Sequence, residues 1–110
     1  LYNLQDKFIS IGLENIFISE ISLAELKFGV ENSNSKVNNK KTLDNFLKGI
    51  QIIPIFNSLD FYAAEKARLR KLGVSIDDFD LLIGATAASN QFTLVTNNII
   101  HFKRIKGIQL

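Results

Sequence analysis

An almost entirely apolar segment near the end of this 110-residue chain places the tightest constraint on its fold. Residues 81–88 read LLIGATAA, and a β-branched run, Phe92-Thr93-Leu94-Val95-Thr96, follows them. A helix without a polar face must be buried on most sides, and such a run is typical of strands that are buried in parallel sheets. A buried helix followed by a buried strand predicts an α/β domain.

The rest of the chain alternates between the same two kinds of segment. The sequence predicts strands at Ile16–Ser19, Gln51–Ile55 and Thr93–Thr96, with a final strand over 105–110. Helices are expected over residues 2–12, 22–30, 40–48, 59–72 and 81–88, and the polar segment 32–39 is expected to be a loop. This alternation predicts one domain, residues 1–110, with a parallel sheet and helices on both faces.

Local signals define several of these helix ends. Ser22 begins a capping-box pattern whose fourth residue is Glu25, which predicts that Ser22 caps the second helix. Ser58 is placed to cap the fourth helix, and Gly73 to end it.

Composition narrows the kinds of chemistry that remain open. The chain has no cysteine and a single histidine, so a disulfide framework, a thiolate zinc site and a cysteine nucleophile are excluded. The net charge of +2 permits an acidic partner such as nucleic acid without requiring one. No apolar run approaches the roughly 18 residues of a membrane span, and no basic-then-apolar leader is visible. We therefore expect a soluble protein of the cytoplasm.

Two carboxylates are placed to meet at one edge of the predicted sheet. Glu25 lies about one turn into the helix after the first strand, and Asp80 lies in the first turn of the apolar helix. If both preceding segments run the same way through the sheet, their side chains converge. Converging carboxylates suit a hard cation, Mg²⁺ or Mn²⁺, better than zinc.

Each candidate also has an ordinary structural explanation. The capping box alone would account for Glu25, and Asp77 and Asp78 are typical caps or solvated loop residues at a helix start. Asp80 is harder to explain in this way, because it would be half-buried beside the apolar helix. By default His101 is a surface residue, and the lysine and arginine side chains that follow it form a solvated patch of Lys103, Arg104 and Lys106.

Three motifs together resemble the PIN-domain ribonucleases of the VapC toxin type. The first runs from Ile18 to Glu31 and contains Ala24-Glu25-Leu26. The second runs from Gly73 to Ala85 and contains Asp80-Leu81-Leu82-Ile83, and the third runs from Leu94 to Ile108. Each motif is weak alone, but the three occur in the right order and spacing over essentially the whole chain.

The resemblance implies a PIN-like three-layer sandwich and a metal-dependent RNA endonuclease, the toxin of a toxin–antitoxin pair. It implies an RNA substrate, an antitoxin that inserts into the active-site groove, and a homodimer. By position, Glu25 and Asp80 match two acids that hold Mg²⁺ or Mn²⁺ in the family. Thr96 and Asn98 match a polar turn that positions metal or phosphate, and Lys66 falls near a basic residue that faces the groove.

Two departures from the family pattern bear on activity. The family begins with a strand that ends in an acid, and nothing before Asn15 resembles it; a partner chain, an exchanged element or upstream sequence is expected to fill that place. The family also has an acid near the Phe that follows the polar turn, where this chain has Ile100 and His101. The alternative is therefore a truncated or non-catalytic PIN-like domain that binds an antitoxin or RNA. A different phosphotransfer fold built on Asp78-Phe79-Asp80 is disfavoured, because these acids precede a helix rather than end an apolar strand.

Overall fold

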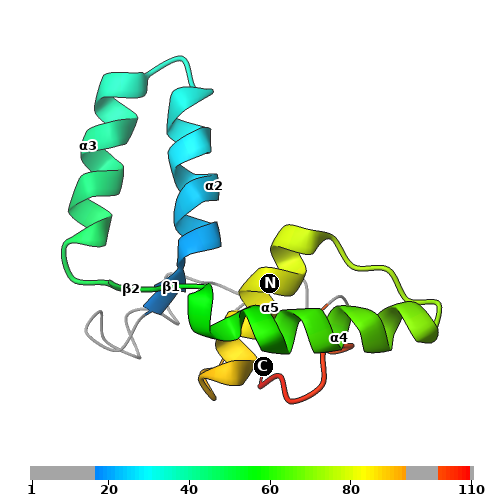
Figure 1. Ribbon diagram of the computed structural model, residues 1–110. Coiled ribbons are helices and arrows are strands. Elements are labelled where there is room, and N and C mark those ends of the chain that lie inside the picture. Colours follow the sequence, from blue (N-terminus) through cyan, green and yellow to red (C-terminus); the bar gives the residue numbers. More distant parts are fainter. Residues whose placement is uncertain (1–16, 94–101, 110) are drawn as a thin grey trace, which may run out of the picture. The chain divides into compact units, whose positions relative to one another are not determined.

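A computed structural model describes residues 17–93 and 102–109 of the chain (Figure 1). The chain divides into two compact units, Leu1–Ile53 and Pro54–Leu110, which we call the first and second units. The predicted helix over 2–12 and the segment that contains Thr96, Asn98 and His101 lie outside the described residues. Among those that are described, no helix is both long and apolar enough to cross a membrane.

The first unit is built on two parallel strands. Strand β1 (Phe17–Ser19) pairs with β2 (Gln51–Ile53), with Phe17 opposite Gln51 and Ser19 opposite Ile53. Between them, α2 (Glu20–Glu31) and α3 (Lys36–Leu47) form a helical hairpin (Figure 1). The predicted parallel pairing is confirmed. The predicted end of the second strand at Ile55 was wrong, because Pro54 has no N–H to continue a ladder.

The cap of α2 differs from the prediction. Helix α2 follows β1 directly, and the Ser19 hydroxyl accepts a hydrogen bond of 3.0 Å from the backbone N–H of Ser22. Ser19 is therefore the N-cap, and the prediction that Ser22 caps this helix was wrong. With the box displaced by three residues, Glu25 is no longer its fourth member, so the structural explanation for this acid does not hold.

Helix α3 begins at Lys36, four residues earlier than predicted, although its first turn is polar. The Thr42 hydroxyl donates to the Asn38 carbonyl oxygen at 3.1 Å, and Lys40 pairs with Asp44 at 3.3 Å. Such i to i+4 contacts support a helix on a solvated face. The polar residues 32–39 therefore include both the loop and the exposed first turn of α3.

The second unit contains a short 3-10 helix η2 (Phe56–Ser58) and two longer helices, α4 (Leu59–Lys71) and α5 (Asp78–Ser89). As predicted, α5 is buried over most of its length, at Leu81 and from Gly84 to Ala88. It packs in a core with the following buried side chains: Leu69, Phe102 and Ile105. The predicted cap at Ser58 was wrong in its chemistry, because the Ser58 hydroxyl bonds to the Ser89 hydroxyl at 2.8 Å instead of a helix N–H.

One further parallel bridge joins Thr93 to Gln109, the last residues of the two described segments. The predicted strand over 105–110 is otherwise replaced by turns, and Ile105 packs in the core with only 2% of its surface exposed. Gly107 adopts a φ of 82° in this segment. The chain turns over residues 103–107, and this places the Ile105 side chain in the core instead of in a strand.

Gly73 ends α4 as predicted, with a φ of 72°. The Gly73 N–H donates to the Arg70 carbonyl at 3.1 Å, and the Val74 N–H donates to the Leu69 carbonyl at 2.9 Å. This pair of bonds is a Schellman motif, and it turns the chain back over the last turns of α4. The loop that leads into α5 is positioned by it.

The close approach of α5 to the C-terminal turn gives a test of this packing. A Cβ atom at Gly84 would lie 2.3 Å from Ile105 Cδ1 and 3.3 Å from Phe102 Cδ1, whereas one at Gly29 in α2 would meet nothing within 4 Å. We expect Gly84→Ala to lower the free energy of unfolding by about 1–3 kcal/mol through overpacking. Gly29→Ala should raise it by up to about 1 kcal/mol through helix propensity. Urea unfolding of both variants checks this, and equal stabilisation by both would contradict the packing.

Candidate active site

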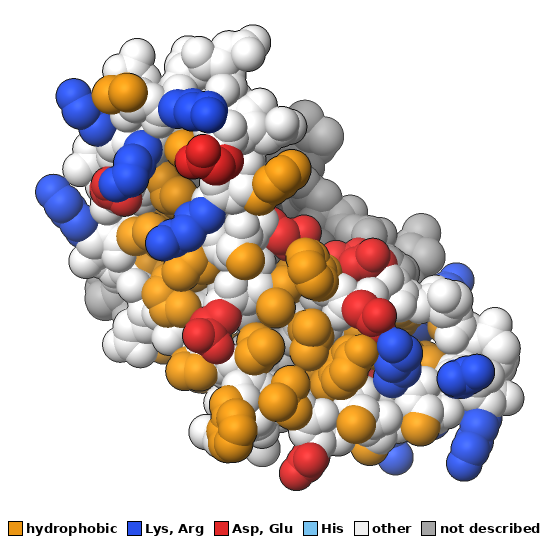
Figure 2. Space-filling view, turned by 45° about the horizontal axis from the view of Figure 1, so that its top comes forward, with side chains coloured by type: hydrophobic (Ala, Val, Ile, Leu, Met, Phe, Trp, Pro, Cys, Tyr) orange, Lys and Arg blue, Asp and Glu red, His pale blue; other side chains and the backbone are white. Residues whose placement is uncertain are grey.

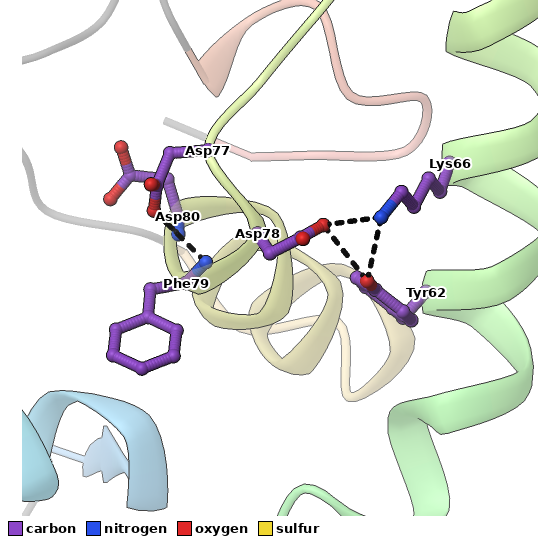
Figure 3. A network of polar contacts seen from close by, with 6 residues as sticks. All are labelled: Tyr62, Lys66, Asp77, Asp78, Phe79 and Asp80. Atoms are coloured by element: carbon purple, nitrogen blue, oxygen red, sulfur yellow. Dashed lines mark hydrogen bonds and ion pairs between the residues drawn. The ribbon is translucent and has the colours of Figure 1, made fainter.

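Three carboxylates at the start of α5 have three different environments. Asp77 is the N-cap: its Oδ1 accepts from the backbone N–H groups of Phe79 at 3.0 Å and of Asp80 at 3.3 Å (Figure 3). The interpretation of Asp77 as a cap is therefore confirmed. An acid in this position also interacts favourably with the positive end of the helix.

Asp78 points the other way, toward α4 (Figure 3). Its Oδ1 accepts from the Lys66 ammonium at 2.8 Å and from the Tyr62 hydroxyl at 2.9 Å, and the Lys66 nitrogen also lies 5.7 Å from the centre of the Tyr62 ring. The hydrogen bond from Lys66 lowers the pKa of Asp78, and the same bond raises the pKa of Lys66. Both side chains are about half exposed, so the pair orients Lys66 more than it stabilises the fold.

Asp80 is half-buried in the first turn of α5, as the sequence predicted. It lies on the side of the helix start that carries Asp77, away from Lys66 (Figure 3). A half-buried carboxylate at a helix start is a hard oxygen donor, which suits Mg²⁺ or Mn²⁺. Asp80 therefore fits the role of a metal ligand in its chemistry and its place in the fold.

The other predicted site residues lie outside the described part of the second unit. Glu25 is exposed on α2, in the first unit, whereas Asp80 belongs to the second. Thr96 and Asn98 lie outside the described residues. Within residues 17–93 and 102–109, no three His, Cys, Asp or Glu side chains converge as metal ligands. The shared site of Glu25, Asp80, Thr96 and Asn98 stays a prediction.

Sequence reasoning missed a buried carboxylate that ties α4 to the C-terminal turn. Glu65 is 5% exposed, and both its oxygens accept from the Arg68 guanidinium at 2.7 Å. The backbone N–H of Lys106 also donates to Glu65, while Arg68 donates to the Arg104 carbonyl at 2.9 Å. The signal in the sequence was the spacing of Glu65 and Arg68, which places them one turn apart on a helix.

The Glu65 network predicts an acid-sensitive contribution to stability. The hydrogen bonds from Arg68 hold the pKa of Glu65 below its ordinary value of 4.5, although burial opposes this. Its contribution is thus complete above that value and is lost as the pH falls through the lower pKa of the folded chain.

We expect Glu65→Gln to lower the free energy of unfolding by about 1.5–3 kcal/mol at neutral pH, because bonds to a charged group are lost. The deficit relative to the unmodified chain should shrink below pH 4.5. The matched change Asp44→Asn, in an exposed pair with Lys40, should cost less than about 0.5 kcal/mol. Urea unfolding at several pH values measures this, and a pH-independent deficit would contradict the assigned ionisation.

Comparison with known proteins decides the family. A family model described as the PIN domain matches residues 3–108. The chain belongs to the PIN-domain family. Among the relatives of this PIN domain, ribonuclease VapC2 of Rickettsia felis is 44% identical over 96 residues, which cover 86% of the chain and 72% of the relative. The tRNA(fMet)-specific endonuclease VapC of Salmonella typhimurium is 26% identical over 102 residues, covering 92% and 77%.

Solved structures agree with the assignment to the VapC type. VapBC2 from Rickettsia felis, bound to a DNA fragment from its promoter, matches with a TM-score of 0.88 and 38% identity, over 96% of this chain and 81% of that one. DNA-bound VapBC from Salmonella typhimurium matches with a TM-score of 0.89 and 26% identity, over 96% and 80%. The PIN-like α/β sandwich that the sequence predicted is confirmed by these PIN-domain neighbours.

Proposed function

We propose that this chain is a metal-dependent endoribonuclease whose divalent cation, Mg²⁺ or Mn²⁺, is held by Glu25 and Asp80. Membership of a family whose relatives are named as ribonucleases supports the RNA substrate. The observation that carries the proposal is the half-buried carboxylate of Asp80 at the start of α5. Glu25 is exposed and does not cap α2, so its carboxylate is available as the second ligand.

Each residue has a defined task in this proposal. A bound divalent cation would lower the pKa of its water and offset the charge that develops on the phosphate. Asp80 and Glu25 supply the anionic oxygens, and Asp77 fixes the first turn of α5 and so the direction of the Asp80 side chain. Thr96 and Asn98 orient the phosphate by hydrogen bonds. No pair of histidines exists in the sequence to do this work by acid–base chemistry alone.

Partner proteins form the second part of the proposal. The neighbouring structures are VapBC complexes, which supports an antitoxin as a partner of this chain. The α2–α3 hairpin exposes large apolar side chains, Leu26, Phe28 and Val37, which a partner or a second copy in a homodimer would cover. A cytoplasmic location follows from the RNA substrate. A non-catalytic PIN-like domain that binds antitoxin or RNA is the competing function.

Substitution of Asp80 and of Asp77 in turn distinguishes a catalytic aspartate from a capping one. In the full-length protein, we expect Asp80→Asn to reduce Mg²⁺- or Mn²⁺-dependent RNA cleavage by at least about 100-fold, because Asn keeps the shape and loses the charge that holds the cation. Asp77→Asn should change cleavage less than about threefold, because Asn caps helices as well as Asp does.

Cleavage of a labelled RNA, followed on a denaturing gel with and without each cation, measures both variants. Circular dichroism confirms that both remain folded. Equal losses in the two variants would mean that Asp80 has been assigned the wrong role. Undiminished cleavage by Asp80→Asn would exclude the metal site, and no cleavage by the unmodified chain would favour the non-catalytic alternative.

A further inference from the structure

A pocket of about 360 Å³ lies between α4 and the loop that leads into α5. The Schellman motif at Gly73 forms it, because it turns the loop back along the helix. Two core residues, Leu69 and Leu81, contribute the floor and are 3% and 1% exposed. Val74 and Ile76 are half-buried and continue the apolar lining. The volume and the apolar surface suit a flat organic group such as a nucleobase.

The rim of this pocket is cationic. Lys66 and Arg70 line it from one face of α4, one helical turn apart, and the exposed hydroxyl of Ser75 lies in the loop. On the face shown in Figure 2, Lys and Arg side chains gather at the right-hand end, where α4 ends, beside hydrophobic surface. An apolar floor with cations at its edge is complementary to a base attached to a phosphate.

The two rim cations differ in their surroundings. Lys66 is already bound by Asp78 and Tyr62, so much of its charge is offset. The Arg70 guanidinium makes no ion pair or hydrogen bond within the part of the chain that the structure describes. Guanidinium groups bind phosphate oxygens through two parallel hydrogen bonds. Arg70 is therefore the stronger candidate for a phosphate contact.

We propose that this pocket binds one nucleotide of a single-stranded RNA, with Arg70 on its phosphate and the apolar floor against its base. The inference rests on the proposed ribonuclease function and adds a substrate subsite to it. Lys66 belongs both to the rim and to the ion pair with Asp78, so the pocket adjoins the start of α5 that carries Asp80. Asp80 itself lies on the other side of this helix start, away from Lys66 (Figure 3), so the subsite holds a nucleotide that flanks the cleavage site and is not the one that is cleaved.

Neighbouring cations on α4 provide a matched charge test. Arg70→Gln and Lys71→Gln each remove one positive charge from the last turn of α4, but Lys71 does not line the pocket. The probe is a short fluorescein-labelled single-stranded RNA, titrated into the full-length protein in EDTA, which prevents metal-dependent cleavage. We expect Arg70→Gln to raise the Kd about tenfold, and Lys71→Gln to raise it less than about threefold through long-range charge alone.

Ser75 provides a test that does not depend on charge. Ser75→Phe fills the pocket from an exposed position and should raise the Kd about tenfold by excluding the base. Ser75→Ala removes only the hydroxyl and should raise the Kd less than about threefold. With Mn²⁺ present, Arg70→Gln should raise KM for RNA cleavage with little change in kcat, because the contact serves binding in both ground and transition states. Thermal unfolding of the four variants reports whether any of them is merely destabilised.

The outcomes separate the subsite from the proposed function. Equal effects of Arg70→Gln and Lys71→Gln, or unchanged binding by Ser75→Phe in a folded variant, overturn the subsite even if Asp80→Asn still abolishes cleavage. Arg70-dependent RNA binding with no metal-dependent cleavage supports the subsite and counts against the nuclease. Loss of antitoxin binding with unchanged RNA affinity in both pocket variants would assign the pocket to the protein partner and overturn the proposal.

Discussion

Burial of α5 is the constraint on which the second unit depends. The helix offers no polar face between Leu81 and Ala88, so solvent must be excluded from it along most of its length. Gly84 lets Phe102 and Ile105 approach its backbone, closer than any other residue at that position would allow. The C-terminal turn is thereby recruited to the core, and the Glu65–Arg68 network fixes it to α4 from the other side.

A helix that is buried along its length can present chemistry at its ends. Both ends of α5 are exposed, and the carboxylates are concentrated at its start. Burial of Leu81 anchors the first turn of α5 to the core, and this fixes the backbone position from which the Asp80 side chain projects. Such anchoring is what a metal ligand requires, because a rigid carboxylate loses little entropy when it binds a cation.

The sequence was informative where one dominant force acts. Burial accounts for the apolar helix, and the alternation of helices and strands accounts for the parallel pairing of β1 and β2. The end of α4 at Gly73 follows from the backbone freedom of glycine. It was misleading where two choices differ by little free energy. Ser19 and Ser22 are both good caps, and the helix starts at the first because the strand ends there.

Contacts between distant residues escaped the sequence for a different reason. The bonds of Glu65 to the Lys106 backbone and of Asp78 to Lys66 join segments that only the folded chain brings together. The same limit applies to the candidate site. Asp80 was singled out because its local pattern is unusual, and Glu25 because it lies about one turn into the helix after the first strand. Thr96 and Asn98 were named through family resemblance alone.

Three carboxylates lie within four residues at the start of α5, and like charges at this spacing repel one another. The structure compensates two of them separately: Asp77 accepts helix N–H groups, and Asp78 accepts from an ammonium and a phenol. Only Asp78 points away from Asp80, toward α4 (Figure 3). The third carboxylate, Asp80, is half-buried in the first turn, and its chemistry suits the divalent cation of the proposed function.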